Sequence, residues 1–144
     1  MISWAREPMK TNGIVETALS VEDVGRSAEF YGSVFGFESL VCDSDFAALA
    51  VPGNAVLLLF RNGARTEPIL TPGGIIPGHD AHGMMHVSFK ISRESLDDCQ
   101  RELTERGIEI ESTVEWPRGG TSLYFRDPDE HLIELMTPGV WEVY

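Results

Sequence analysis

The chain contains an internal repeat. Residues 13–60 and 84–138 each show one strand-like run, one helical run and three further strand-like runs, judged by the period of their apolar residues. A repeat of two such units needs a pseudo-symmetric assembly. If the two sheets curl toward one another, their polar faces line the same space. The repeat therefore predicts an α+β fold of two tandem βαβββ modules, whose curved mixed sheets form a shared cavity.

Both helical runs carry their own start and stop signals. Asp23 and Ser92 precede them, and short polar side chains at this position accept hydrogen bonds from the free N–H groups of the first turn. Gly36 and Gly107 follow them, and glycine readily adopts the left-handed conformation that ends a helix. The two helices are therefore expected within residues 22–37 and 92–107.

The remaining segments are short. Residues 61–83, "RNGARTEPILTPGGIIPGHDAHG", are rich in glycine and proline and show no periodicity, so we expect a linker or a loop over a cavity. Residues 1–12 are predicted to be an N-terminal extension and residues 139–144 a C-terminal tail. A single domain should then span residues 13–138, with one module on each side of the linker.

Composition excludes some partners. The 144 residues suffice for one domain with a real core, and the formal charge of −12 argues against nucleic acid or an anionic membrane surface. No apolar run approaches the roughly 18 residues of a membrane span, and the first residues lack the apolar core of a secretion signal. Cys42 and Cys99 are expected to be buried free thiols. These features favour a cytoplasmic protein.

Strand alternation assigns side chains to faces. Apolar residues on one face of each strand can pack on a helix, which leaves a second face that carries polar groups. The polar-bearing faces comprise Glu16, Ala18 and Ser20 in the first strand, His86, Ser88 and Lys90 in the fifth, and Ser122, Tyr124 and Arg126 in the seventh.

Glu134 is the unusual residue of the last strand, "HLIELM". A buried carboxylate without a partner is very costly, so Glu134 needs a compensating charge or contact with water. Glu16 and His86 occupy matching positions in the two modules, and Leu58 matches Glu134. We therefore expect these four residues to converge at one depth of the cavity, where a metal ion would compensate Glu134.

Three stretches resemble a known family: "ALSVEDVGRSAEFYGSVFGFE", "GMMHVSFKI" and "SLYFRDPDEHLIEL". They are similar to the vicinal oxygen chelate superfamily, which includes glyoxalase I, bleomycin- and fosfomycin-resistance proteins and extradiol ring-cleaving dioxygenases. The resemblance covers residues 13 to 138. It implies the fold strongly and the reaction weakly, because one fold supports many chemistries.

The resemblance implies a divalent metal held by the first, fifth and eighth strands, at Glu16, His86 and Glu134. Family members commonly have His at the first of these positions, and glyoxalase-like members have a fourth ligand where this chain has Leu58. Two carboxylates neutralise a dication and favour harder ions such as Mn²⁺ or Mg²⁺, while Fe²⁺, Ni²⁺ and Zn²⁺ remain candidates.

Other residues are candidates for contact with a substrate. Tyr124 resembles the tyrosine with which extradiol dioxygenases contact a substrate oxygen, so it is a candidate catalytic and substrate-binding residue. His82, or His79 in the same loop, is a candidate catalytic histidine. Ser88 and Arg126 are candidate substrate-binding residues, although Arg126 could instead pair with a neighbouring carboxylate.

Two functions follow from these features. The first is a metal-dependent enzyme that chelates two adjacent oxygens of a small organic substrate, with a dioxygenase-like oxidoreductase reaction as the first expectation and lyase or transferase chemistry as alternatives. The second is a metal-free protein that binds or sequesters a small drug-like molecule. His131 is expected to be a turn residue. By resemblance, the chain should form a homodimer.

Overall fold

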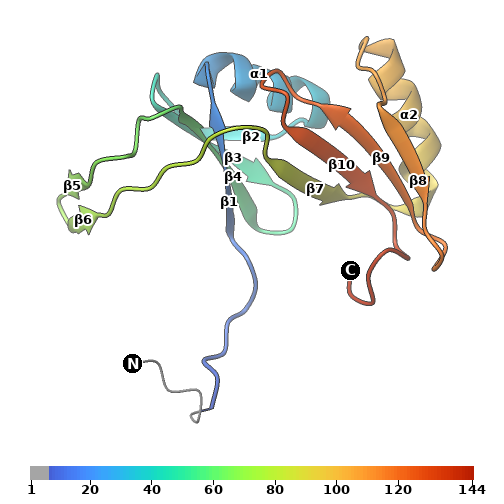
Figure 1. The fold of residues 1–144 in the computed structure, drawn as a ribbon, viewed down its shortest axis with the longest axis horizontal. Helices are drawn as coiled ribbons and strands as arrows, with labels where there is room; N and C mark the ends of the chain where they lie inside the picture. Colours follow the sequence, from blue (N-terminus) through green and yellow to red (C-terminus); the bar gives the residue numbers. More distant parts are fainter. Residues whose placement is uncertain (1–6) are drawn as a thin grey trace.

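The computed structural model describes residues 7–144, and residues 1–6 of the predicted N-terminal extension lie outside the described part. The first module forms a four-stranded sheet in the order β1-β4-β3-β2 with helix α1, in which β1 and β4 are parallel and the other pairs antiparallel (Figure 1). Its elements are β1 (Glu16–Val21), α1 (Val24–Phe35), β2 (Glu38–Cys42), β3 (Phe46–Val51) and β4 (Ala55–Arg61).

The second module repeats this arrangement. Its four-stranded sheet has the order β7-β10-β9-β8, with β7 and β10 parallel, so the same topology recurs with α2 in place of α1. Its elements are β7 (His86–Lys90), the 3₁₀ turn η1 (Arg93–Ser95), α2 (Leu96–Glu105), β8 (Ser112–Glu115), β9 (Thr121–Arg126) and β10 (Leu132–Met136). The predicted pair of βαβββ modules is confirmed.

The capping signals of the first helix act as predicted. Asp23 caps α1 by accepting a hydrogen bond from the Arg26 N–H at 2.9 Å, and Gly36 ends the helix at a φ of 71°. In the second module Ser92 caps the 3₁₀ turn η1, by accepting from the Ser95 N–H at 3.2 Å, while α2 itself starts after Ser95 without a side-chain capping bond. Gly107 follows α2 with a φ of 73°, as predicted.

The apolar strand faces meet in one core. Leu19 of β1, Phe125 of β9 and Ile133 of β10 are 1% exposed or less, and Phe35 of α1 stacks near Phe89 of β7 with ring centroids 5.2 Å apart. The core therefore runs through both modules, and burial of this apolar surface is the main force that holds them together.

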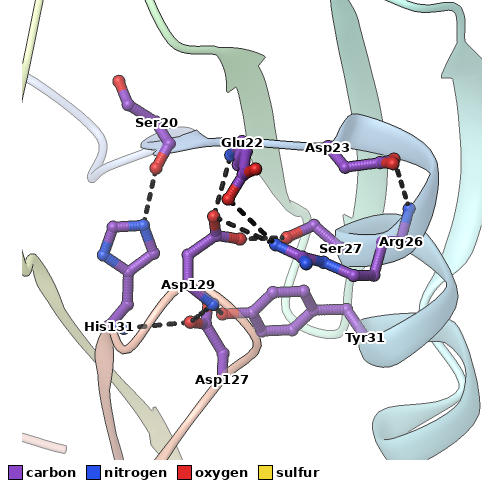
Figure 2. A network of polar contacts seen from close by, with 9 residues as sticks. All are labelled: Ser20, Glu22, Asp23, Arg26, Ser27, Tyr31, Asp127, Asp129 and His131. Carbon is purple, nitrogen blue, oxygen red and sulfur yellow. Dashed lines mark hydrogen bonds and ion pairs between the residues drawn. The ribbon is translucent and has the colours of Figure 1, made fainter.

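A polar network also joins the modules (Figure 2). The turn between β9 and β10 packs on α1, where Asp127 accepts a 2.7 Å hydrogen bond from the Tyr31 hydroxyl. Asp129 of this turn accepts from the Glu22 N–H at 2.8 Å and from the Ser27 hydroxyl at 3.1 Å. Burial, and then the nearby Asp127 carboxylate, raises the pKa of Tyr31, so the phenol keeps its proton and remains a donor.

His131 lies inside this network. We expected a turn residue, and His131 is instead 1% exposed and forms hydrogen bonds with β1 and with the residue before β7. Its Nδ1 accepts from the Met85 N–H at 2.9 Å, so Nε2 carries the proton and donates to the Ser20 carbonyl at 2.6 Å. The histidine therefore connects β1 to the start of β7 in its neutral form.

The segment between the modules is not wholly irregular. It contains a hairpin of β5 (Ile69–Thr71) and β6 (Gly74–Ile76), which projects away from the first sheet (Figure 1). Its base is closed by a 2.7 Å hydrogen bond from the His79 N–H to the Arg65 carbonyl. The sequence analysis missed this hairpin, because each strand has three residues and too few alternations to form a pattern.

The expectation of two buried thiols is wrong for Cys42. Cys42 is exposed and Cys99 is partly buried, and both are free. Every residue of β2 is exposed, Cys42 included, and this strand is an edge of its sheet with a neighbouring strand on one side alone. Among residues 7–144, no helix is long and apolar enough to cross a membrane.

Candidate functional site

Glu134 is buried on the polar-bearing face of the second sheet. The residue is 4% exposed, and its Oε2 accepts a 2.5 Å hydrogen bond from the Ser122 hydroxyl. That hydroxyl in turn accepts from the Trp116 indole Nε1–H at 2.8 Å. One carboxylate oxygen is thus fixed by a chain of two donors, and the other is left for a further partner.

That partner is His86. Its Nδ1 lies 2.9 Å from the Leu132 carbonyl oxygen, which can only accept, so Nδ1 carries a proton. Its Nε2 lies 3.2 Å from Glu134 Oε1. With a neutral ring and an ionised carboxylate, two lone pairs would face each other at this distance, so the pair needs either a proton between the two atoms or a bound cation.

This donor set fits a divalent metal ion. An imidazole whose Nδ1–H is held by a backbone carbonyl presents Nε2 in the form that metals bind. The Ser122 hydroxyl orients the carboxylate in the same way. His86 is about half exposed and Glu134 is buried, so a ligand could approach from the side of the histidine.

Tyr124 lies beside this pair. It sits directly opposite Glu134 in the β9–β10 ladder, and its ring centroid is 6.5 Å from that of His86. Partial burial, and then the neighbouring Glu134 carboxylate, raises the pKa of Tyr124 above its ordinary value. The phenol therefore stays protonated at neutral pH and is available as a hydrogen-bond donor.

Glu16 does not join the other two predicted ligands. It is exposed at the start of β1 and lines a different cavity, of about 740 Å³, over the first sheet with Leu58. Within residues 7–144, no three His, Cys, Asp or Glu side chains lie close enough to hold one ion. The expected convergence of Glu16, His86, Glu134 and Leu58 in one chain is therefore wrong: Glu16 and Leu58 face a cavity over the first sheet, whereas His86 and Glu134 pair on the second.

The remaining candidates lie apart from one another. His82 pairs with Asp80 at 2.6 Å and its side chain is 74% exposed. Arg126 is engaged by Glu111 at 2.8 Å, the alternative left open by the sequence. Ser88 lines a cavity of about 700 Å³ between the modules, where the C-terminal tail also lies.

Comparison with known proteins gives the family. A family model described as the glyoxalase/bleomycin resistance protein/dioxygenase superfamily matches residues 13–135, a range that includes Glu16, His86 and Glu134. The chain belongs to this superfamily. The match confirms the resemblance to the vicinal oxygen chelate fold that the three sequence stretches indicated.

Relatives within the superfamily are named metallothiol transferases. The chain is 29% identical to the metallothiol transferase FosB of Shouchella clausii, over 88% of this chain and 80% of FosB. It is 30% identical to FosB of Lysinibacillus sphaericus, over 90% of this chain and 84% of FosB. These names fit a metal-dependent superfamily member and give no specific support to a dioxygenase.

Solved structures give the same fold. A lactoylglutathione lyase from Agrobacterium tumefaciens superimposes with a TM-score of 0.84 at 27% identity, covering 93% of this chain and 99% of that one. The fosfomycin resistance protein FosX of Listeria monocytogenes superimposes with a TM-score of 0.65 at 21% identity, covering 89% and 94%. The second likeness supports the fold alone.

The sequence analysis did not identify two residues that contribute to the site, Ser122 and Trp116. Ser122 shares a strand face with Tyr124, two residues away, so alternation placed it correctly but gave no reason to choose it. Trp116 follows β8, and nothing in the local sequence of this superfamily member links its indole to Ser122.

Proposed function

We propose that this protein is a metal-dependent enzyme that acts on a small, oxygen-bearing organic substrate. The observation that carries the proposal is the His86–Glu134 pair, in which two fixed acceptors point at each other 3.2 Å apart. Superfamily membership supports it, as do relatives named metallothiol transferase. The names metallothiol transferase and lactoylglutathione lyase favour transferase or lyase chemistry over our first expectation of a dioxygenase.

A third ligand would come from a second copy of the chain. Glu16 is exposed on β1, an edge strand of the first sheet, and His86 is on β7, an edge strand of the second. In a symmetric dimer, Glu16 of one copy could meet His86 and Glu134 of the other. Exposed apolar residues near Glu16, including Leu40 and Val41, would become buried in such a dimer contact.

The charges suit this assembly. Glu16 and Glu134 together would balance a dication, and carboxylate with imidazole is a donor set for Mn²⁺, Fe²⁺, Ni²⁺ or Zn²⁺. When bound, the ion would act as a Lewis acid toward two adjacent substrate oxygens. Among these ions, the two carboxylates favour the harder ones.

The chain's own groups would orient and polarise the substrate. Tyr124 holds its proton and would donate a hydrogen bond to a substrate oxygen on which negative charge develops. Ser122 and Trp116 hold Glu134 in one orientation, so little reorganisation is needed at the site. Tyr124 is thus the proposed catalytic residue, and the other two are positioning residues.

A mixing experiment tests the shared site. Glu16→Gln and Glu134→Gln dimers should each bind little Mn²⁺, because each removes one ligand from every site. Co-expression of the two variants should restore about one quarter of the wild-type sites, since half of randomly paired dimers are heterodimers with one intact site of two. Bound Mn²⁺ per chain, measured by elemental analysis after dialysis, gives the answer.

The same experiment has two contrary outcomes. If co-expression restores no Mn²⁺ while each variant is dimeric, Glu16 does not complete the site in trans. If wild-type protein binds none of the four ions, the metal-dependent function itself fails.

A metal-free binding protein is the second candidate. The cavity over the first sheet favours it, because this cavity is mostly apolar and holds Leu58 where glyoxalase-like members carry a ligand. In that case Glu134→Gln should leave the affinity for a bound small molecule unchanged, whereas an enzyme that needs the metal should lose activity.

A further inference from the structure

The cavity over the first sheet contains a charged group that the proposed function does not use. Arg65 lines this cavity of about 740 Å³ together with apolar side chains of β2, β3, β4 and the β5–β6 hairpin. The lining is dominated by Leu40, Val41, Phe46, Ala48, Val56, Leu58, Phe60, Ile69 and Ile76. Its volume is in the range of small-molecule sites.

Within residues 7–144, the guanidinium of Arg65 forms no ion pair with a carboxylate. It lies 5.4 Å from the ring centroid of Phe46 and 5.5 Å from that of Phe60. In that residue range the guanidinium donates one long hydrogen bond, of 3.5 Å, to the Ala64 carbonyl. The aromatic faces orient the cation and leave its N–H donors for another acceptor.

Nearby carboxylates are already engaged. Asp43 accepts from the N–H groups of Asp45 and Phe46 at 2.8 and 2.9 Å, and these bonds lower its pKa more than the charge of Arg65 does. Asp45 forms an ion pair with Arg61 at 2.8 Å. An anion from outside the chain would therefore not have to displace an internal partner of Arg65.

The backbone around Arg65 is fixed by a close crossing. The His79 N–H donates to the Arg65 carbonyl at 2.7 Å, and the His79 ring meets the Phe60 ring with centroids 4.7 Å apart. A Cβ atom on Gly78 would overlap the Thr66 carbonyl oxygen, so only glycine permits this approach. The position of Arg65 is thus built into the fold, which reduces the cost of ordering it on binding.

Arg65 and Glu16 lie at opposite ends of the cavity. Glu16 pairs with Val56 in the β1–β4 ladder, and Arg65 stacks on Phe60, four residues further along β4. At about 3.3 Å per residue, the two ends are roughly 13 Å apart. A ligand that spans them needs an elongated apolar body with an anionic group at one end.

We propose that this cavity binds elongated, mainly apolar organic acids, with Arg65 pairing with the carboxylate. The inference rests on the proposed function in taking the cavity as the substrate site, and it names the substrate class. The carboxylate would lie at Arg65, and the end of the substrate that carries the reacting oxygens would lie near Glu16. Charge-assisted pairing with an arginine fork is strong and directional, so the acid should bind better than its neutral amide.

The test compares 8-phenyloctanoate with 8-phenyloctanamide by calorimetric titration of the full chain. Wild-type protein should bind the acid about tenfold or more tightly than the amide. Arg65→Met keeps an apolar stem but removes the charge, so both ligands should bind equally. Arg101→Met is the matched control: Arg101 is exposed on α2 and pairs with Asp98, and its loss changes net charge equally.

Gly78→Ala is the second variant. It retains Arg65 but disturbs its backbone, and it should weaken binding of the acid more than binding of the amide. An acid preference that survives in Arg65→Met overturns the inference, and so does wild-type protein that binds neither ligand. A third outcome also overturns the inference. If Arg65→Met changes dimer association in sedimentation experiments but changes the affinity for neither ligand, the cavity is occupied by a second copy of the chain.

Mn²⁺ titration of the same samples separates this inference from the proposed function. Arg65→Met should bind Mn²⁺ like the wild type. If wild-type protein shows the acid preference without binding any metal, the metal-dependent function fails and the acid site stands. If metal binds and the preference is absent, only the acid site fails.

Discussion

Glu134→Gln should lower the affinity for Mn²⁺ by at least about 100-fold and leave the fold intact. The amide preserves the shape of the side chain and can still accept the Ser122 hydrogen bond, but it lacks the negative charge that a dication needs. Removal of a group that merely supports a ligand already costs about 10- to 100-fold, so loss of the ligand itself should cost more. Calorimetric titration with Mn²⁺ measures the change.

The stability of the metal-free variant provides a second readout. In the wild-type protein without metal, Glu134 and the His86 Nε2 need a shared proton at 3.2 Å. A neutral amide can donate a hydrogen bond to that nitrogen, so Glu134→Gln should melt at the wild-type temperature or slightly above it. The added metal should then raise the melting temperature of the wild type only.

Glu115→Gln is the matched control. Glu115 lies on β8 of the same sheet, and its Oε2 accepts a 3.0 Å hydrogen bond from the Thr121 hydroxyl, as Glu134 does from Ser122. It has no histidine partner, so its replacement should leave Mn²⁺ affinity unchanged. Equal losses in the two variants, or no loss in Glu134→Gln, would contradict the assignment of Glu134 as a ligand.

Local patterns sufficed to predict the elements and their faces. Alternation in β7 distinguished His86 from the apolar residues of that strand, which pack in the core. The predicted caps of the first helix, Asp23 and Gly36, are the caps of α1 in the structure. These features depend on a few neighbouring residues, whose spacing alone determines the direction of each side chain.

Contacts between distant segments could not be predicted in this way. The repeat matched Glu16 with His86 by position in each module, but it could not say whether the two faces meet within one chain. The same limit applies to His131, whose partners Ser20 and Met85 lie 111 and 46 residues away in the sequence. Tertiary packing determines the distances between residues that are far apart in the chain, and local sequence patterns do not encode these distances.

The second large effect concerns stability. His131→Ala should lower the free energy of unfolding by about 4 kcal/mol, because it removes two hydrogen bonds of a buried side chain and leaves a cavity. The Met85 N–H and the Ser20 carbonyl, both partly buried, would each lose a partner. The melting temperature should fall by roughly 10 °C, measured by calorimetry or circular dichroism.

Two comparisons make this prediction specific to the network. His82→Ala removes an exposed histidine whose 2.6 Å contact with Asp80 is on the surface, and it should change stability by less than about 1 kcal/mol. Tyr31→Phe removes one hydrogen bond to the Asp127 carboxylate, which retains two backbone donors, so we expect an intermediate loss of about 1.5 kcal/mol.

The order of these losses tests how the modules are joined. If the polar network connects them, the loss should grow from His82→Ala through Tyr31→Phe to His131→Ala, and unfolding should remain a single transition because both modules share one core. If His131→Ala is no less stable than His82→Ala, the apolar core alone holds the modules together. The "DPDEH" turn would then contribute little to stability, although it lies against α1 and β1.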